Sequence, residues 1–226
     1  LNTLAFTVCF ACWTLNGVLV TFLVDKGIFN WSVVEVGWLL GIPILSGAIF
    51  RLPIGILTDK YGGKIIFSVL LFLCSIPLFL LPFADTFWSF AVLSFLFGLV
   101  GTSFAVGIGY TSVWYPQNWQ GRALGIFGMG NAGAAITTFM APTLLNRFSE
   151  SDPINGWKML PITYASVLVS IGILFIIFAK NKKPAGDSKN IKTLLTPLKS
   201  ARVWRFGAYY FLVFGCFVAY SQWLLP

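Results

Sequence analysis

Residues 86–121 read TFWSFAVLSFLFGLVGTSFAVGIGYTSVWYPQNWQG and contain no Asp, Glu, Lys or Arg. About 20 apolar residues in an α-helix, at ~1.5 Å rise per residue, match a hydrocarbon core of ~30 Å. The stretch is continuously apolar rather than alternating, which favours a helix over a barrel strand, because a helix satisfies its own backbone in lipid. We therefore predict a membrane-spanning helix within this stretch.

The same pattern recurs along the chain, with further uncharged runs at 1–24, 123–146, 159–179 and 206–226. Of the 226 residues, 58% are hydrophobic and 10% are charged. An ordinary soluble domain has roughly 25% charged residues, so a water-soluble globule is excluded. A signal peptide has a single apolar region at the start of a chain and does not explain a repeat. The sequence predicts an all-α polytopic membrane protein with spans at about 2–24, 36–57, 65–84, 87–111, 121–145, 158–179 and 203–225.

The formal charge of +8 is placed unevenly. Between the apolar runs 159–179 and 206–226 lie eight of the fifteen basic residues: Lys180, Lys182, Lys183, Lys189, Lys192, Lys199, Arg202 and Arg205. A cytoplasmic loop beside the anionic lipid bilayer explains this cluster better than nucleic-acid binding does. Loops after the even-numbered spans carry eleven basic residues and loops after the first, third and fifth carry three. We expect an inner (plasma) membrane protein with a cytoplasmic N-terminus.

The long basic connection divides the chain into parts. We expect an N-terminal six-helix transmembrane bundle at 1–179, a cytoplasmic inter-bundle loop at 180–202 and the first helix of a second bundle at 203–226. Two six-helix halves joined by a cytoplasmic loop are a known arrangement in membrane proteins. Because the chain starts at Leu1 and stops at Pro226 inside an apolar run, we interpret it as a fragment of a longer protein, which we expect to be a monomer.

Arg51 is the one charged residue deep inside a predicted span. A guanidinium at such depth costs about 2.5 kcal/mol or more, so we expect it to face a cavity and to hold a partner. No Asp or Glu lies at matching depth in any predicted span, which favours an anionic substrate as that partner. Pro43, Gly47 and Gly55 fall at steps of four on the same helix face and leave room beside it. The alternatives are backbone carbonyls, an acid in the missing half, or a position nearer an interface.

Residues 55–64 read GILTDKYGGK and occupy the turn between the second and third predicted spans. This stretch resembles the signature of the Major Facilitator Superfamily, in which Gly, Asp and basic residues follow at this spacing. Glycines permit a tight turn, and Asp59 can carry a charge pair that breaks when two bundles rock. The residues of this conformational motif are Gly55, Asp59, Lys60, Gly62 and Lys64. A plain solvated turn is the alternative.

Residues 128–135 read GMGNAGAA and lie within the fifth predicted span. The spacing matches a dinucleotide-binding G-x-G-x-x-G, but no strand precedes it and residues 123–146 are uncharged. The glycines instead allow close helix approach in the membrane. Asn131 remains as one amide in a dry setting, where it can donate to an anion or bond across helices.

Together with Arg51, this segment is similar to the nitrate/nitrite porter family of the Major Facilitator Superfamily. Members carry a glycine-rich signature with Asn in the fifth span and a substrate-binding Arg in the second. The resemblance implies that Arg51 binds nitrate and that Tyr210, four residues before Phe214-Gly215, contacts substrate. It further implies that the signature positions form part of the substrate site: Gly128, Gly130, Asn131 and Gly133. The family's second substrate Arg and second glycine signature would lie beyond Pro226.

These observations favour a secondary transporter for nitrate, nitrite or both, working by alternating access. The deep parts of the spans hold no protonatable residue, which leans toward nitrate/nitrite exchange over proton symport. A carrier for another small anion, such as a carboxylate, and a non-transporting membrane sensor are the alternatives. We expect no enzyme, no cofactor and no metal, because the chain has no His and its C-x-x-C pair, Cys9 and Cys12, lies in an apolar helix.

Overall fold

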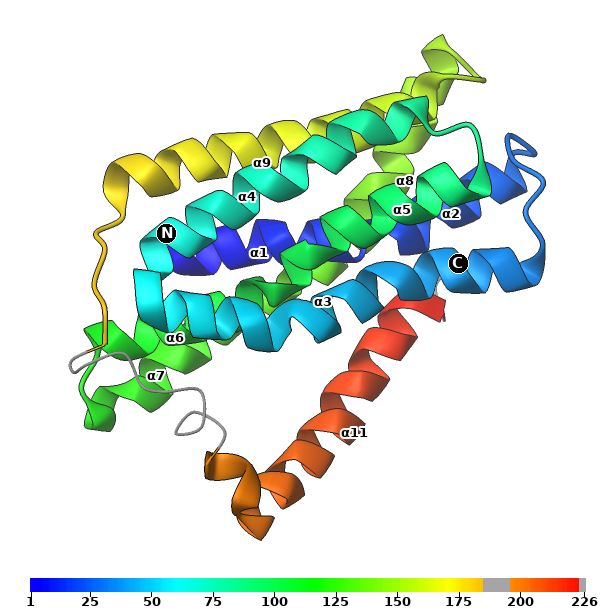
Figure 1. Ribbon diagram of the computed structural model, residues 1–226. Helices are drawn as coiled ribbons and strands as arrows, with labels where there is room; N and C mark the ends of the chain where they lie inside the picture. Colours follow the sequence, from blue (N-terminus) through cyan, green and yellow to red (C-terminus); the bar gives the residue numbers. More distant parts are fainter. Residues whose placement is uncertain (185–195, 224–226) are drawn as a thin grey trace.

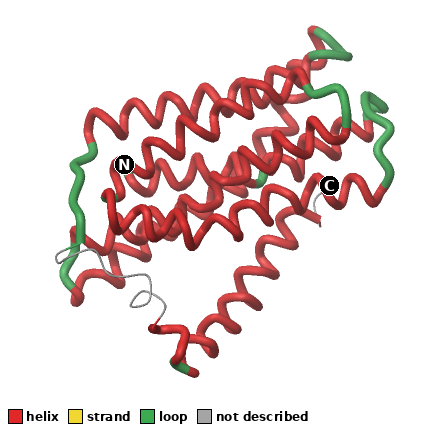
Figure 2. The backbone as a smooth tube through the Cα atoms, viewed as in Figure 1, coloured by secondary structure: helices red, strands yellow, loops and turns green. Residues whose placement is uncertain are grey.

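The computed structural model describes residues 1–184 and 196–223, and within these ranges the chain consists of helices and their connections, without a strand (Figure 2). The α-helices are α1 (Asn2–Trp13), α2 (Leu15–Asp25), α3 (Val33–Tyr61), α4 (Gly63–Leu80), α5 (Phe87–Gly98), α6 (Ser103–Trp114), α7 (Gln117–Gly128), α8 (Gly133–Ser151), α9 (Met159–Phe178) and α11 (Ala201–Trp223). Short 3₁₀ segments are η1 (Leu81–Phe83), η2 (Leu99–Thr102), η3 (Met129–Ala132), η4 (Gly156–Lys158) and η5 (Thr196–Lys199).

Across the described ranges these helices form seven stretches that are long and apolar enough to cross a membrane. Their bounds are Asn2–Asp25, Val33–Tyr61, Gly63–Phe83, Phe87–Trp114, Gln117–Ser151, Gly156–Phe178 and Ala201–Trp223. The all-α polytopic membrane fold is therefore confirmed. The final residues of the seventh predicted span, 224–226, lie outside the described residues, as do Lys189, Lys192 and the rest of 185–195.

Two predicted spans were too short, and a helix cap explains where one of them begins. The second span begins at Val33 rather than near residue 36 because Ser32 and Glu35 form a capping box, with Glu35 Oε2 accepting from the Ser32 N–H at 2.8 Å. The fifth span runs over Gln117–Ser151 rather than 121–145. Arg122 and Arg147, near its two ends, belong to this helical stretch. Because they are charged, we had expected them to lie in the connections between spans.

Three spans are interrupted near their middle, which the apolar pattern did not predict. The first changes from α1 to α2 at Thr14, the fourth passes through η2 and the fifth passes through η3. Mid-helix 3₁₀ stretches often mark functional hinges. The glycine-rich segment at 128–135 therefore contains a change of helix type, and Asn131 lies within it.

The spans alternate in direction, so their connections gather at two ends of the bundle (Figure 1). The turns at 61–63 and 114–117 and the segment after α9 lie at one end, together with the N-terminus. We call this end the basic end, because six of the described Lys and Arg residues lie there: Lys60, Lys64, Arg122, Lys180, Lys182 and Lys183. Connections 26–32, 84–86 and 152–155 lie at the opposite end. The cytoplasmic location of the basic end stays a prediction.

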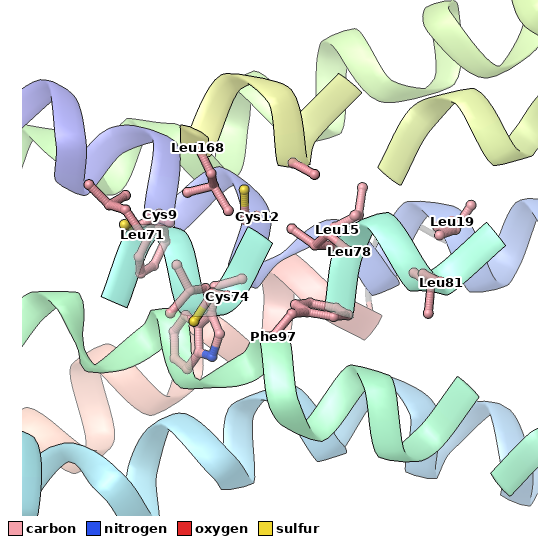
Figure 3. Packing of buried hydrophobic residues seen from close by; sticks show 14 of the residues in the cluster. Cys9, Cys12, Leu15, Leu19, Leu71, Cys74, Leu78, Leu81, Phe97 and Leu168 are labelled. Atoms are coloured by element: carbon pink, nitrogen blue, oxygen red, sulfur yellow. The ribbon is translucent and has the colours of Figure 1, made fainter. Parts of the chain in front are cut away.

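The bundle core is made of aromatic and aliphatic side chains around α1. Figure 3 shows Cys9 and Cys12 of α1 and Cys74 of α4 among leucines that include Leu71 and Leu168. All three thiols are fully buried and free. The C-x-x-C pair therefore contributes to packing.

Helices α3 and α5 are in close contact where α5 presents Gly98. A Cβ added at Gly98 would collide with Pro43 Cα and Ser46 Oγ of α3. Ser46 is fully buried and its hydroxyl donates to the Pro43 carbonyl at 3.1 Å. Small residues at helix interfaces permit such approach in membranes, where packing rather than a hydrophobic driving force holds helices together.

We predict that Gly98→Ala destabilises the bundle by about 1–3 kcal/mol, the usual cost of overpacking. Thermal unfolding of the full-length protein in detergent micelles, followed by tryptophan fluorescence, measures this loss. Gly41→Ala is the matched control, because a Cβ at Gly41 meets nothing within 4 Å. Equal melting temperatures for the two variants would contradict the packing role of Gly98.

Candidate functional site

Arg51 lies in the middle of α3 and is half-buried, with few partners of its own. Its Nη2 donates to the Gly101 carbonyl of η2 at 3.4 Å, which is long for a hydrogen bond. Its guanidinium lies over the ring of Phe104, 5.7 Å from the centroid. Its Nε is buried and has no hydrogen-bond partner within the described ranges. Since a guanidinium has five N–H donors, most of its hydrogen-bonding capacity is unused.

Acidic residues do not supply the missing partner within residues 1–184 and 196–223. The six carboxylates described there stand at helix ends or in connections: Asp25, Glu35, Asp59, Asp85, Glu150 and Asp152. The seventh, Asp187, is outside the described residues. Of the alternatives for Arg51, a backbone carbonyl is present, but the single long bond to Gly101 leaves the charge largely uncompensated.

Tyr210, which belongs to α11, also lies beside Arg51. Its side chain lies near the Arg51 guanidinium. Its ring stacks on Phe214 at a centroid distance of 4.9 Å and lies 6.2 Å from Phe104. Phe104 and Phe214 are also stacked, at 6.2 Å. The structure therefore brings two predicted site residues, Arg51 and Tyr210, together beside an aromatic pair.

Phe104 and Phe214 were not among the predicted site residues. A phenylalanine in an apolar span has the same appearance in sequence whether it packs in a core or lines a site. One signal was available, because Phe214 follows Tyr210 by four residues and so lies on the same helix face. For Phe104 the signal was weaker: it follows Gly101 by three residues, next to the small-residue face of the fourth span.

The helix face that carries Arg51 combines packing and open positions. Pro43 and Gly47 are buried. The Pro43 carbonyl accepts a hydrogen bond from Trp13 Nε1 at 2.9 Å. A Cβ at Gly47 would lie 3.0 Å from that same nitrogen. One turn beyond Arg51, Gly55 has open space where a Cβ would be. The room predicted beside Arg51 therefore exists on the Gly55 side only.

The glycines of the fifth-span signature also include both closely packed and open positions. Gly130 is in contact with Phe6, and Gly133 faces the backbone of Thr7 and Ala11 of α1. Gly128 meets nothing within 4 Å. These contacts give Gly130 and Gly133 a packing role, and their predicted part in substrate binding stays a prediction.

Asn131 is half-buried in η3, and its Oδ1 has no hydrogen-bond partner in the described part of the chain. No hydrogen bond joins it to Arg51 or Tyr210 there. It keeps an unused polar atom near the packing surface of α1. Its role as a second donor to substrate therefore stays a prediction.

The signature turn at 55–64 is tightly built. Gly62 adopts φ +92°, which L side chains rarely adopt, so the turn requires glycine here. Asn181 Nδ2 donates to the Tyr61 carbonyl at 3.0 Å and lies against Gly62. Lys60 lies over the Tyr61 ring at 5.3 Å. Asp59 is exposed and lies at the basic end, as does Lys64. The conformational role of the motif stays a prediction.

A cleft of about 610 Å³ lies at the basic end, apart from Arg51. It is lined by Leu1, Asn2, Thr3, Tyr110, Thr111, Trp114, Tyr115, Ala123, Ile126, Phe127, Phe175, Phe178, Ala179 and Lys180. None of the predicted substrate residues lines it. The cluster around Arg51 therefore remains the candidate site.

Within the described residues, a multi-span helical bundle with a cation, Arg51, in mid-span beside a helix that follows a long connection is typical of polytopic membrane transporters. The Major Facilitator Superfamily matches residues 1–226, and the chain belongs to this family. The prediction that it is not an enzyme is thereby confirmed.

Curated relatives place the chain near nitrate and nitrite carriers. It is 41% identical over 231 residues to the probable nitrate/nitrite antiporter NarK1 of Thermus thermophilus, covering 99% of this chain and 52% of that protein. It is 29% identical over 226 residues to the nitrite extrusion protein of Bacillus subtilis (strain 168), covering 99% and 54%. It is 27% identical over 224 residues to the probable nitrate transporter NarT of Staphylococcus epidermidis, covering 99% and 56%. The predicted family likeness is confirmed, and the chain spans about half the length of these relatives.

We predict different outcomes for two signature glycines. Gly133→Ala drives a Cβ into the α1 backbone, so it lowers the melting temperature of the full-length protein by several degrees. Gly128→Ala meets open space and leaves that temperature unchanged or slightly higher. Thermal unfolding in micelles compares the two, and a larger loss for Gly128→Ala would contradict the assigned contacts.

Proposed function

We propose that the protein containing this chain exchanges nitrate and nitrite across the plasma membrane by alternating access, with its basic end and N-terminus in the cytoplasm. The observation that carries the proposal is the incompletely compensated Arg51 guanidinium, held mid-span against Tyr210 and an aromatic pair. The names of the related proteins in Thermus thermophilus and Bacillus subtilis agree with this substrate class.

Arg51 fits a small planar oxyanion because its donors form a rigid planar fork. Such a fork binds two oxygens at once, whereas an ammonium acts as a point charge. Within the described residues, the guanidinium has one long hydrogen bond to Gly101 and lies over the face of Phe104. An arriving anion supplies both the charge and the acceptors that these contacts lack. Compensation of the buried charge is therefore the main source of binding free energy.

The aromatic groups set the shape of the site. Phe104 and Phe214 present flat rings about 6.2 Å apart, and the ring of Tyr210 continues the stack. A planar anion fits along such surfaces better than a tetrahedral one. The Tyr210 hydroxyl can add one donor from α11, so substrate would contact both α3 and α11. Asn131 is the predicted further donor from the fifth span.

Exchange is favoured by the energetics of the membrane potential. Moving one charge against 100 mV costs about 2.3 kcal/mol, and a one-for-one exchange of monovalent anions avoids that cost. Within the described ranges, the carboxylates stand at helix ends, so the spans offer no deep proton carrier. Uptake of one anion is then driven by release of the other, rather than by a proton gradient.

We predict that Arg51→Lys in the full-length protein reduces nitrate uptake into nitrite-loaded proteoliposomes about 10- to 100-fold. The lysine keeps the charge and loses the fork, and each charge-assisted hydrogen bond contributes about 1.5–3 kcal/mol. Arg147→Lys is the control, because Arg147 is exposed at the end of α8. Full uptake by Arg51→Lys would contradict the bidentate role.

Competition by formate, oxalate and chloride in the same assay separates nitrate from other small anions. Stronger inhibition by formate than by unlabelled nitrate would point to a carboxylate carrier instead. Nitrate binding without any uptake would point to a sensor.

We predict that Tyr210→Phe weakens nitrate affinity about 10- to 100-fold while the aromatic stack stays intact. The loss corresponds to one hydrogen bond to a charged partner. Isothermal titration of nitrate into the purified full-length protein measures it. Tyr209→Phe, at an exposed neighbouring position, is the matched control. The same loss in both variants would contradict a direct role for the Tyr210 hydroxyl.

A further inference from the structure

Trp13 is the last residue of α1, and its indole is buried at a junction of α1, α3 and η2. Its Nε1 donates to the Pro43 carbonyl of α3 at 2.9 Å. Its ring lies against Gly101 of η2, where an added Cβ would be 2.5 Å from Nε1 and 2.6 Å from Cε2. One side chain of the first span therefore contacts both the helix that carries Arg51 and the segment whose carbonyl accepts from Arg51.

The junction lies one helical turn from Arg51. Gly47 precedes Arg51 by four residues, so the two positions share one face of α3. A Cβ at Gly47 would be 3.0 Å from Trp13 Nε1 and 3.3 Å from the Gly101 Cα. The indole and the backbones of α3 and η2 therefore meet at one point, and their contacts set where Gly101 lies relative to α3.

The indole is held on several sides and has little freedom to move away. Trp13 is 3% exposed, its ring is rigid and its Nε1 is bonded to α3. Behind it, the interruption of the first span is closed by Thr14, whose Oγ1 donates to the carbonyls of Phe10 and Ala11 at 3.2 Å each. The end of α1 is thus fixed, and added bulk at Gly101 has to displace η2.

A displacement of η2 acts directly on Arg51. The Gly101 carbonyl accepts from Arg51 Nη2 at 3.4 Å, a long hydrogen bond that orients the guanidinium without satisfying it. A carbonyl that came nearer would compete with an anion for this donor. A carbonyl that moved away would leave the guanidinium to be ordered by the anion itself, which costs binding free energy. Displacement in either direction therefore weakens anion binding.

We infer that Trp13 is a positioning residue for the candidate anion site. By holding Gly101 against α3, it keeps the carbonyl at the distance that orients Arg51 and leaves its donors available. The inference rests on the proposed function and adds to it a residue of the first span, which acts through Gly101 and Arg51 rather than by contact with the anion.

Trp13→Phe in the full-length protein tests this role, because it removes the Nε1 donor and keeps an aromatic ring. The Pro43 carbonyl still accepts from Ser46 Oγ, so we expect little change in melting temperature. We expect nitrate affinity, measured by isothermal titration, to weaken about 3- to 10-fold, of the order of one neutral hydrogen bond. Trp157→Phe is the matched control: Trp157 is 2% exposed, lies in η4 at the end opposite the basic end, and its replacement leaves the affinity unchanged.

Gly101→Ala tests the same contact from its other partner and weakens nitrate affinity by a similar factor. Combined with Trp13→Phe, it adds little to the larger single loss, because both changes break one contact, whereas independent effects would multiply. Gly172→Ala is the control for bulk, since a Cβ there meets the ring of Phe72, 3.0 Å away, between α9 and α4. In an Arg51→Lys background, Trp13→Phe changes the affinity by less than about twofold, because the group it positions is gone.

Modification of arginines by phenylglyoxal gives a readout that needs no anion. Mass spectrometry follows the rate at Arg51 relative to the rate at Arg147, which is exposed at the end of α8. We expect this ratio to change in Trp13→Phe and in Gly101→Ala and to stay at the wild-type value in Trp157→Phe. A general loss of stability would alter both arginines and leave the ratio unchanged.

The outcomes separate this role from the proposed substrate. Where the wild-type protein binds nitrate, unchanged affinity in Trp13→Phe, or an equal loss in the Arg51→Lys background, overturns the positioning role. Where the wild-type protein binds no nitrate, the proposed substrate is refuted and the arginine ratio decides: a changed ratio supports the positioning role and an unchanged ratio overturns it. If Trp13→Phe fails to fold, Gly101→Ala decides by the same criteria.

Discussion

A positive charge in the middle of an apolar helix is the constraint on which the candidate site depends. Placing Arg51 there costs about 2.5–3.5 kcal/mol on an insertion scale, and a single 3.4 Å bond to Gly101 recovers only part of this. A fixed carboxylate would satisfy the charge permanently and block the site. A ring face and one distant carbonyl hold the guanidinium in place while leaving its donors available to a mobile anion.

Glycines around this charge serve two separate purposes. Gly47, Gly98 and Gly133 bring α1, α3, α5 and α8 into close contact. Gly55 and Gly128 face open space and do not hold helices together. Helix α11 is packed less tightly, since its buried side chains within the described range are Val218 and Gln222.

Sequence patterns predicted the fold well because each span is read from length and apolarity, which the bilayer dictates. They predicted Arg51 for the same reason, since a charge in an apolar run is conspicuous. Span ends were less accurate, because Ser32 and Glu35 build a cap from residues that read as a connection. Phe104 escaped notice because its function comes from its position beside Arg51 and not from its residue type. The contact of Trp13 with Gly101 joins two segments far apart in the chain, and no local pattern records such a pair.

The interruptions at η2 and η3 coincide with the polar atoms of the candidate site. Gly101, whose carbonyl accepts from Arg51, lies in η2, and Asn131 lies in η3. A 3₁₀ stretch has poorer hydrogen-bond geometry than an α-helix, so its backbone groups are less completely satisfied by their own helix. Irregular backbone at membrane depth is tolerated where it is buried in protein or lines a cavity. Both interruptions pack against α1, the helix that also carries Phe10 toward α11. Local weakening of helix geometry therefore places backbone polarity at the depth of Arg51, where the proposed function requires an anion to bind, without adding a charged residue that would pair with Arg51 permanently.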